Sequence, residues 1–332
     1  MSRSINIMPT GPLDEIVGLA KLAEDLGYQR CWVYDEGLHS HDVYVTLSAI
    51  AGATSTIKLG PGITNPFVRH PGATASAIAS LDQLSGGRAF LGLGAGGSLT
   101  LGPLAITRVK PVTAVSDMVW CLRRLFAGET VDHHGVAFGF HQARLDTIGP
   151  GSRADIEIIL AGRGPRITAL GASIGDGFVL SYIHKALLAS HAAEVSEKAS
   201  ATDAGGVGRP FSISYSTKVV TTDEAFEQAR AQLTFRLVDS PPPVKDLIGL
   251  DQAGTNRLRQ VLAQGGPSEA AGLIDPDWVD HFVLVGTVEQ CASEVAHLMA
   301  TTAIDEFQLP VHPGPAAADL IQSFAPSRSS SD

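Results

Sequence analysis

The chain has 332 residues, of which 44% are hydrophobic and 17% are charged, and its formal net charge is −10. This length accommodates one large domain or two small ones, and an acidic chain without a basic stripe is not expected to bind nucleic acid. The sequence contains no apolar run of membrane-spanning length and no apolar region of a secretory signal in its first residues, so we expect a cytoplasmic protein.

The first third of the chain alternates short apolar runs with helical patterns. We expect strands at residues 5–8, 30–34, 57–62 and 89–94, and helices at residues 13–26, 43–53 and 71–84. A helix-like apolar stripe follows at 111–127. In residues 131–153, apolar residues alternate with turn formers, which predicts a small β excursion.

The alternation resumes at residue 156. We expect strands at 156–160, 177–180, 211–220 and 305–310, helices at 165–174 and 185–199, and mainly helical structure at 223–298 that is broken at 240–243 and 265–267. Eight strands alternating with helices predict an α/β fold, a (β/α)8 TIM barrel. We expect one domain over residues 1–315, with insertions near 99–110, 131–153 and 223–300, and a flexible tail at 316–332.

A doubly wound open sheet is the competing architecture, because it also alternates strands and helices. The segment MPTGPLDE after the first strand lacks the dinucleotide-binding fingerprint. The run GLGAGG at 92–97 follows the fourth strand instead, and no acidic residue stands at the expected distance after it. These two departures argue against a nicotinamide coenzyme.

Two neighbouring strands of the first half end in residues suited to holding a ligand. The first is followed by Gly62, Thr64, Asn65 and Pro66, and the second by a run of glycines at 94–97. Barrels of this kind bind their ligands at the carboxyl ends of the strands. The hydroxyl and amide groups can hydrogen-bond a ligand, and the glycines let the backbone approach it closely.

Several segments together resemble the luciferase-like flavin and deazaflavin superfamily. They are LAEDLGYQRCWVYDE, GPGITNPFVRHPGATASAIASLDQLSGGRAFLGLGAGG, ILAGRGP and DHFVLVGTVEQC, and the resemblance extends over nearly the whole chain. The greatest resemblance is to the methylenetetrahydromethanopterin reductase branch. It implies a barrel oxidoreductase that transfers a hydride between reduced coenzyme F420, a deazaflavin, and a small organic acceptor. The alternative is an FMN-dependent monooxygenase of the same fold.

The resemblance also implies where the coenzyme binds, including a cis peptide bond at Gly62 and Ile63. Arg163 and its glycine neighbours precede the helix that begins at Pro165, so a guanidinium and free backbone N–H groups can hold a phosphodiester. The turn at 175–177 either faces the coenzyme or only connects two elements. The candidate coenzyme-binding residues are Gly62, Ile63, Thr64, Asn65, Gly94, Gly96, Gly97, Gly162, Arg163, Gly164, Gly175 and Asp176.

The sequence departs from the family pattern where acids are expected. Many deazaflavin-dependent members carry Asp-His after the second strand, but here Asp35 is followed by Glu36. Asn6 and Gly97 stand where the reductase branch tends to carry acids, and an amide cannot transfer a proton at neutral pH. We therefore expect a substrate other than the pterin of that branch. The catalytic candidates are Glu36, Asp35 and His39, with His41 and Tyr182 as further possible acids.

The sequence leaves two alternatives open. Asp35 either contacts the ligand or caps local backbone amides. The missing acids also allow a relic barrel that binds flavin without turnover.

The cysteines at 31, 121 and 291 have neither zinc-site spacing nor the even number of a disulfide framework, so we expect no metal site. The small residues of 73–80 suit a close-packed interface, and we expect a homodimer.

Overall fold

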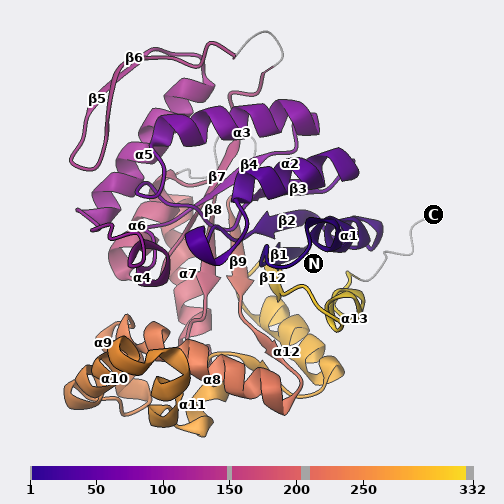
Figure 1. Ribbon diagram of the computed structural model, residues 1–332, viewed down its shortest axis with the longest axis vertical. Helices are drawn as coiled ribbons and strands as arrows, with labels where there is room; N and C mark the ends of the chain where they lie inside the picture. Colours follow the sequence, from indigo (N-terminus) through magenta and orange to yellow (C-terminus); the bar gives the residue numbers. More distant parts are fainter. Residues whose placement is uncertain (1, 148–151, 203–209, 327–332) are drawn as a thin grey trace.

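The computed structural model describes residues 2–147, 152–202 and 210–326, and its core is a barrel of parallel strands (Figure 1). The eight strands run in the order β3-β2-β1-β12-β9-β8-β7-β4. Isolated bridges join Leu59 to Ala89 and Thr64 to Leu93, so β3 and β4 nearly close the barrel. The strands are β1 (Ser2–Ile7), β2 (Arg30–Val33), β3 (Lys58–Pro61), β4 (Phe90–Leu93), β7 (Glu157–Ala161), β8 (Gly177–Ser181), β9 (Ser212–Ser216) and β12 (Glu306–Val311). The predicted TIM barrel is confirmed.

Helices surround the barrel because each returns the chain to the start of the next parallel strand. The main ones are α1 (Leu13–Asp25), α2 (Val43–Ala53), α3 (Pro71–Ser85), α5 (Pro111–Phe126), α6 (Pro165–Ile174), α7 (Lys185–Ala201) and α12 (Val288–Thr301). Two short helices, η1 (Gly37–His39) and α4 (Ser98–Leu101), lie in the loops after β2 and β4. Among the described helices, we find none with the length and apolar character needed to cross a bilayer.

A group of helices inserted after β9 lies at one end of the barrel (Figure 1). It contains α8 (Asp223–Val238), α9 (Pro242–Leu247), α10 (Gln252–Ala270), η2 (Ala271–Leu273) and α11 (Pro276–Asp280). This helical insertion has an apolar core of its own that includes Leu233 and Leu258, and Tyr182 from the barrel joins that core. The predicted breaks are present, because α8 ends before the prolines and the backbone at Gly266 is not helical.

The expected strand at 211–220 is wrong in its extent. It divides into β9, which belongs to the barrel, and β10 (Val219–Val220), which pairs with β11 (Leu284–Val285) in a separate sheet. Between them, the hydroxyl of Thr217 donates a hydrogen bond to the carbonyl of Phe282. This bond holds the chain where it leaves the barrel for the insertion, and β11 was missed because it is only two residues long.

The two remaining segments were predicted in part. An antiparallel hairpin of β5 (Val131–His134) and β6 (Gly139–Ala143) forms the expected β excursion. The start of the segment that we expected to be a flexible tail is instead α13 (Ala317–Ser323), whose Ile321 is buried. Tyr28 donates a hydrogen bond to the Ile321 carbonyl and so holds α13 beside α1. Residues 327–332 of that tail lie outside the described residues.

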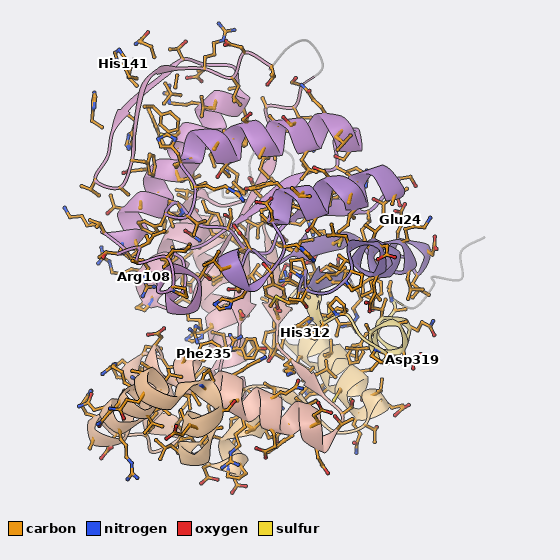
Figure 2. All side chains as sticks on the ribbon, viewed as in Figure 1. Glu24, Arg108, His141, Phe235, His312 and Asp319 are labelled. Carbon is orange, nitrogen blue, oxygen red and sulfur yellow. The ribbon has the colours of Figure 1, made fainter. Side chains whose placement is uncertain are left out.

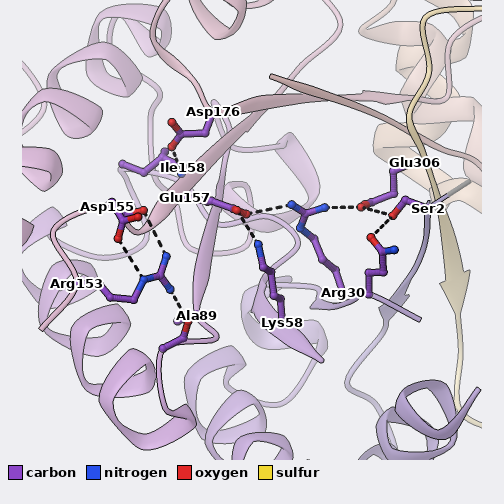
Figure 3. A network of polar contacts seen from close by, with 12 residues as sticks. Ser2, Arg30, Lys58, Ala89, Arg153, Asp155, Glu157, Ile158, Asp176 and Glu306 are labelled. Carbon is purple, nitrogen blue, oxygen red and sulfur yellow. Dashed lines mark hydrogen bonds and ion pairs between the residues drawn. The ribbon is translucent and has the colours of Figure 1, made fainter. Parts of the chain in front are cut away.

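Buried ion pairs occupy the barrel interior near the amino ends of the strands (Figure 3). Arg30 on β2 contacts Glu157 on β7 at 3.0 Å and Glu306 on β12 at 2.6 Å. Lys58 on β3 contacts the second oxygen of Glu157 at 2.7 Å. Burial alone would raise the pKa of Glu157, but Arg30 and Lys58 lower it to about 2. The network therefore stabilises the end of the barrel opposite the candidate site.

Candidate active site

The loops after β3 and β4 lie next to each other at the carboxyl end of the barrel and form part of the candidate site. The peptide bond between Gly62 and Ile63 is cis, as the family resemblance implied. The side chain of Ile63 packs against Trp32 and the apolar layer inside the barrel. A Cβ on Gly94 would lie 2.4 Å from Cδ1 of Ile63, so an alanine at this position would require the Ile63 side chain to move. The direct effect of the glycine at position 94 is therefore to make room for the Ile63 side chain.

Asn6 on β1 holds the loop after β3 in place. Its buried amide donates hydrogen bonds to the Gly62 carbonyl at 2.9 Å and to Oε1 of Gln308 at 3.2 Å. A Cβ on Gly62 would lie 2.7 Å from that of Trp32, so the position has no room for a side chain. Asn6 is therefore a structural hydrogen-bond donor in this chain.

The polar residues after β3 are partly used by the fold itself. Thr64 is buried and donates a hydrogen bond of 2.7 Å to Asp35. The side-chain oxygen of Asn65 accepts from the backbone N–H groups of Phe67 and Val68, which leaves only its amide nitrogen for a ligand. Gly96 has a φ of +74°, which favours glycine, and Gly97 is exposed with open space at its Cβ position. Gly97 is therefore the most accessible of these glycines.

The two carboxylates after β2 are buried to different degrees and have separate partners. Asp35 is buried, and that burial raises its pKa against the opposing Thr64 hydrogen bond. Glu36 is partly buried and accepts a hydrogen bond of 2.8 Å from the Thr100 hydroxyl on α4. Burial raises the pKa of Glu36 as well, while Thr100 and the charge of Arg236 lower it. Both groups therefore retain a proton to a higher pH than an ordinary carboxylate.

The histidine candidates lie outside this buried group. His39 is exposed at the end of η1, although its charge acts on Glu36. The exposed ring of His41 is hydrogen-bonded to the Gly11 carbonyl at 2.7 Å. Both imidazoles are exposed to solvent, whereas Asp35 and Glu36 are at least partly buried, so the carboxyl groups are the better placed candidate proton donors.

The amino terminus of α6 and Arg163 form a candidate anion site after β7, the strand that pairs with β4. Pro165 is the first residue of α6 and no side chain caps the helix, so its first N–H groups can bind an anion. A Cβ on Gly162 would lie 2.3 Å from Ile167, so this glycine serves helix packing. Burial and the charge of Arg236 lower the pKa of Arg163 to about 10, so it remains cationic at neutral pH.

The assignment of Gly175 and Asp176 to the coenzyme needs correction. Both residues precede β8 and therefore lie at the amino end of the barrel, away from the carboxyl ends that hold the other candidates. The Asp176 carboxylate accepts from the backbone N–H of Ile158 at 2.7 Å and from Arg123 at 3.2 Å. It joins β7 to α5, and Gly175 has no space for a side chain.

The comparisons with known proteins identify the family. A model of the luciferase-like monooxygenase family matches residues 3–306. The chain belongs to the luciferase-like monooxygenase family. It is accordingly an oxidoreductase enzyme.

Individual relatives extend over most of the chain. The chain is 33% identical over 310 residues to 5,10-methylenetetrahydromethanopterin reductase of Archaeoglobus fulgidus, which covers 90% of each protein. It is 32% identical over 270 residues to F420-dependent hydroxymycolic acid dehydrogenase of Mycobacterium tuberculosis, which covers 75% of this chain and 71% of that one. The coenzyme F420-dependent tetrahydromethanopterin reductase from Methanopyrus kandleri has a similar structure, with a TM-score of 0.80 and 25% sequence identity. The match covers 98% of this chain and 97% of that one.

This luciferase-like barrel also brings to the site residues that the sequence analysis did not name. Arg236 on α8 lies with its guanidinium carbon 3.3 Å from the centre of the Tyr182 ring. Lys218 follows β9 and is buried, and Thr100 lies on α4. Figure 2 shows Phe235, the neighbour of Arg236, and His312, which follows β12, at the junction of the barrel and the helical insertion. Arg236 lies in the mainly polar helix α8, and no local sequence motif distinguishes it.

Proposed function

We propose that this enzyme transfers a hydride between reduced coenzyme F420 and a small organic acceptor. The observation that carries the proposal is the similarity, over most of the chain, to proteins that use this coenzyme with two different acceptors. The site described above is compatible with it. The acceptor itself is left open, because Asn6 and Gly97 replace the acids that the reductase branch tends to carry.

The residues at the carboxyl end of the barrel fit a deazaflavin coenzyme. Its ring would lie against Ile63 and the accessible backbone near Gly97, and its phosphodiester would bind Arg163 and the amino terminus of α6. When bound, the coenzyme supplies the hydride. The protein would align the acceptor and exclude water from the reacting atoms.

Glu36 is the proposed proton donor to the acceptor. It lies directly after β2, at the barrel end that holds the other candidates, and its raised pKa favours the protonated form. Thr100 fixes one of its oxygens, which orients the carboxyl group. The proposed role of Asp35 is to hold Thr64 in the loop behind the ring.

FMN-dependent oxygenation is the second candidate. The anion site at Arg163 would serve the single phosphate of FMN as well as a phosphodiester. The F420-dependent relatives favour the deazaflavin. The two candidates differ in their use of oxygen, because hydride transfer from F420 to an acceptor does not consume it.

A homodimer is part of the proposal. Helices α2 and α3 lie side by side on the outer surface of the barrel (Figure 1). Val45 on α2 is 60% exposed and Leu84 on α3 is 57% exposed, and an interface over these helices would cover both apolar side chains. Sedimentation equilibrium should give twice the mass of one chain, and a mass of one chain would reject this part of the proposal.

Turnover tests the reaction directly. The purified enzyme is mixed with reduced F420 without oxygen, and reappearance of the oxidised chromophore is followed with enones, imines, aldehydes and ketones. Acceptor-dependent oxidation supports the proposal. Oxygen consumption with reduced FMN and no F420 oxidation would favour the monooxygenase, and binding of F420 without oxidation by any acceptor would favour the relic barrel.

A further inference from the structure

Three cationic side chains from different elements meet between the barrel and the helical insertion. Arg163 follows β7, Lys218 follows β9, and Arg236 comes from α8. We call them the basic cluster. Nη1 of Arg163 donates to the Arg236 carbonyl at 3.4 Å, and the charge of Arg236 acts on both Arg163 and Lys218. Neighbouring like charges repel one another, so this arrangement favours a bound anion.

The cluster has little internal compensation. The negative charge of Asp239 raises the pKa of Arg163, and the positive charge of Arg236 lowers the pKa of Glu36. Across residues 2–147, 152–202 and 210–326, however, no salt bridge to any member of the cluster is found. Within the part of the chain that the structure describes, Nζ of Lys218 donates only to the neutral side chain of Gln228, at 3.3 Å. Burial raises the pKa of Glu36, which weakens the charge compensation that this carboxyl group can provide. A positive potential is therefore left at this end of the barrel.

Arg236 has the geometry of a preorganised anion donor. Its guanidinium carbon lies over the Tyr182 ring, 3.3 Å from the ring centre, and the Tyr182 backbone has a φ of +50°. Its Nε is buried and has no hydrogen-bond partner in the described part of the chain. A guanidinium binds a carboxylate through two parallel N–H groups, and a buried donor without a partner is costly. A ligand oxygen would satisfy it.

We propose that Arg236 and Lys218 form an oxyanion subsite for a carboxylate group on the acceptor. This inference rests on the proposed function and adds the chemical class of the acceptor. The coenzyme phosphodiester would occupy Arg163 and the α6 terminus, whereas Arg236 acts on Glu36, the proposed proton donor. An acceptor held by Arg236 would therefore lie beside the group that protonates it.

The test compares carboxylates with their neutral amides. The protein is saturated with oxidised F420 and titrated with acetate, crotonate and cinnamate, and with acetamide, crotonamide and cinnamamide, while coenzyme fluorescence and Tm are followed. The expected result is at least a tenfold preference for one or more of the carboxylates. Arg236→Gln and Lys218→Gln should each remove most of it, and Arg236→Lys should keep part of it.

The controls separate the acceptor from the coenzyme. Arg257→Gln removes an exposed charge from α10 in the same insertion and should change nothing. Arg236→Gln should leave the affinity for F420 within about twofold of wild type. If it weakens F420 instead and spares the carboxylate preference, the cluster serves the coenzyme tail and the inference is overturned. Equal binding of every acid and amide also overturns it.

Failure of the proposed function gives a different result. If F420 does not bind at all, the hydride-transfer proposal fails. The Tm of the coenzyme-free protein still reports whether carboxylates bind through Arg236. The two proposals are therefore judged by separate readouts.

Discussion

Thr100 on α4 donates a hydrogen bond of 2.8 Å to Glu36 after β2, so two loops of the candidate site are joined through the proposed proton donor. A hydroxyl donor stabilises the carboxylate form, so its removal raises the pKa of Glu36 further. If the protonated form is active, kcat/KM falls as the pH rises through this pKa. Thr100→Val should therefore move the falling limb to higher pH, and Thr100→Ser should leave it in place. An unchanged limb in Thr100→Val would contradict the role of Glu36.

Removal of the acid itself should reduce the rate more than the binding. Glu36→Gln keeps the shape of the side chain but removes the transferable proton, and general acids contribute roughly 10²- to 10⁴-fold. We expect kcat to fall within that range and the Kd of F420 to change little. Asp35→Asn serves as the comparison in single-turnover experiments. A larger rate loss in Asp35→Asn than in Glu36→Gln would indicate that Asp35, and not Glu36, is the proton donor.

Two glycines of one loop should respond differently to the same added methyl group. At Gly94 a Cβ would lie 2.4 Å from Ile63, whereas the corresponding position at Gly97 is open. Overpacking costs about 1 to 3 kcal/mol, so Gly94→Ala should lower stability by that amount and weaken F420 binding by displacing Ile63. Gly97→Ala should keep wild-type stability in urea unfolding. Equal stability of both variants would show that Ile63 is not confined by Gly94.

Restoring an acid at position 6 should be harmful. Asn6 donates to the Gly62 carbonyl, and an aspartate would place an acceptor against that oxygen in a buried position. The lost donor and the buried repulsion should cost about 1 to 3 kcal/mol. Asn6→Asp should therefore lower Tm and weaken F420 binding. A variant as stable as wild type would mean that the hydrogen bond to Gly62 contributes nothing.

The ion network at the opposite end of the barrel predicts acid sensitivity. Glu157 has a pKa of about 2 in the folded protein against an ordinary 4.5, so the unfolded chain binds more protons between these values. Its stabilisation, about 3 kcal/mol at most, is present above pH 4.5 and is lost as the pH falls towards 2. The stability difference between wild type and Glu157→Gln should shrink from pH 6 to pH 3. Glu129→Gln, which alters an exposed pair with Arg124, should show little difference at either pH.

The barrel could be predicted from sequence because its buried strands are short apolar segments separated by segments with helical patterning. All eight barrel strands lie where these runs occur, and the glycines at 60, 62, 92 and 94 mark positions where a side chain would clash. Short elements were less predictable. The two-residue strand β11 is held by pairing with β10, which is a tertiary effect that its own sequence does not reveal.

The candidate site was predictable only where a residue follows its strand directly. Glu36, Thr64 and Arg163 are of this kind, and parallel strands bring such positions together. Arg236 comes from a helix far along the chain and enters the site only because the insertion folds over the barrel. Asp176 was misassigned although the predicted strand at 177–180 already places it at the amino end of that strand, away from the other candidates.

The most direct test of the hydride-transfer proposal is anaerobic titration of the protein with reduced F420 and, separately, with reduced FMN. Both titrations are repeated with Arg163→Ala, in which the proposed phosphodiester contact is lost. We expect F420 to bind at least tenfold more tightly than FMN, and Arg163→Ala to weaken it by at least tenfold. Tighter binding of FMN, or F420 binding that is indifferent to Arg163, would contradict the account.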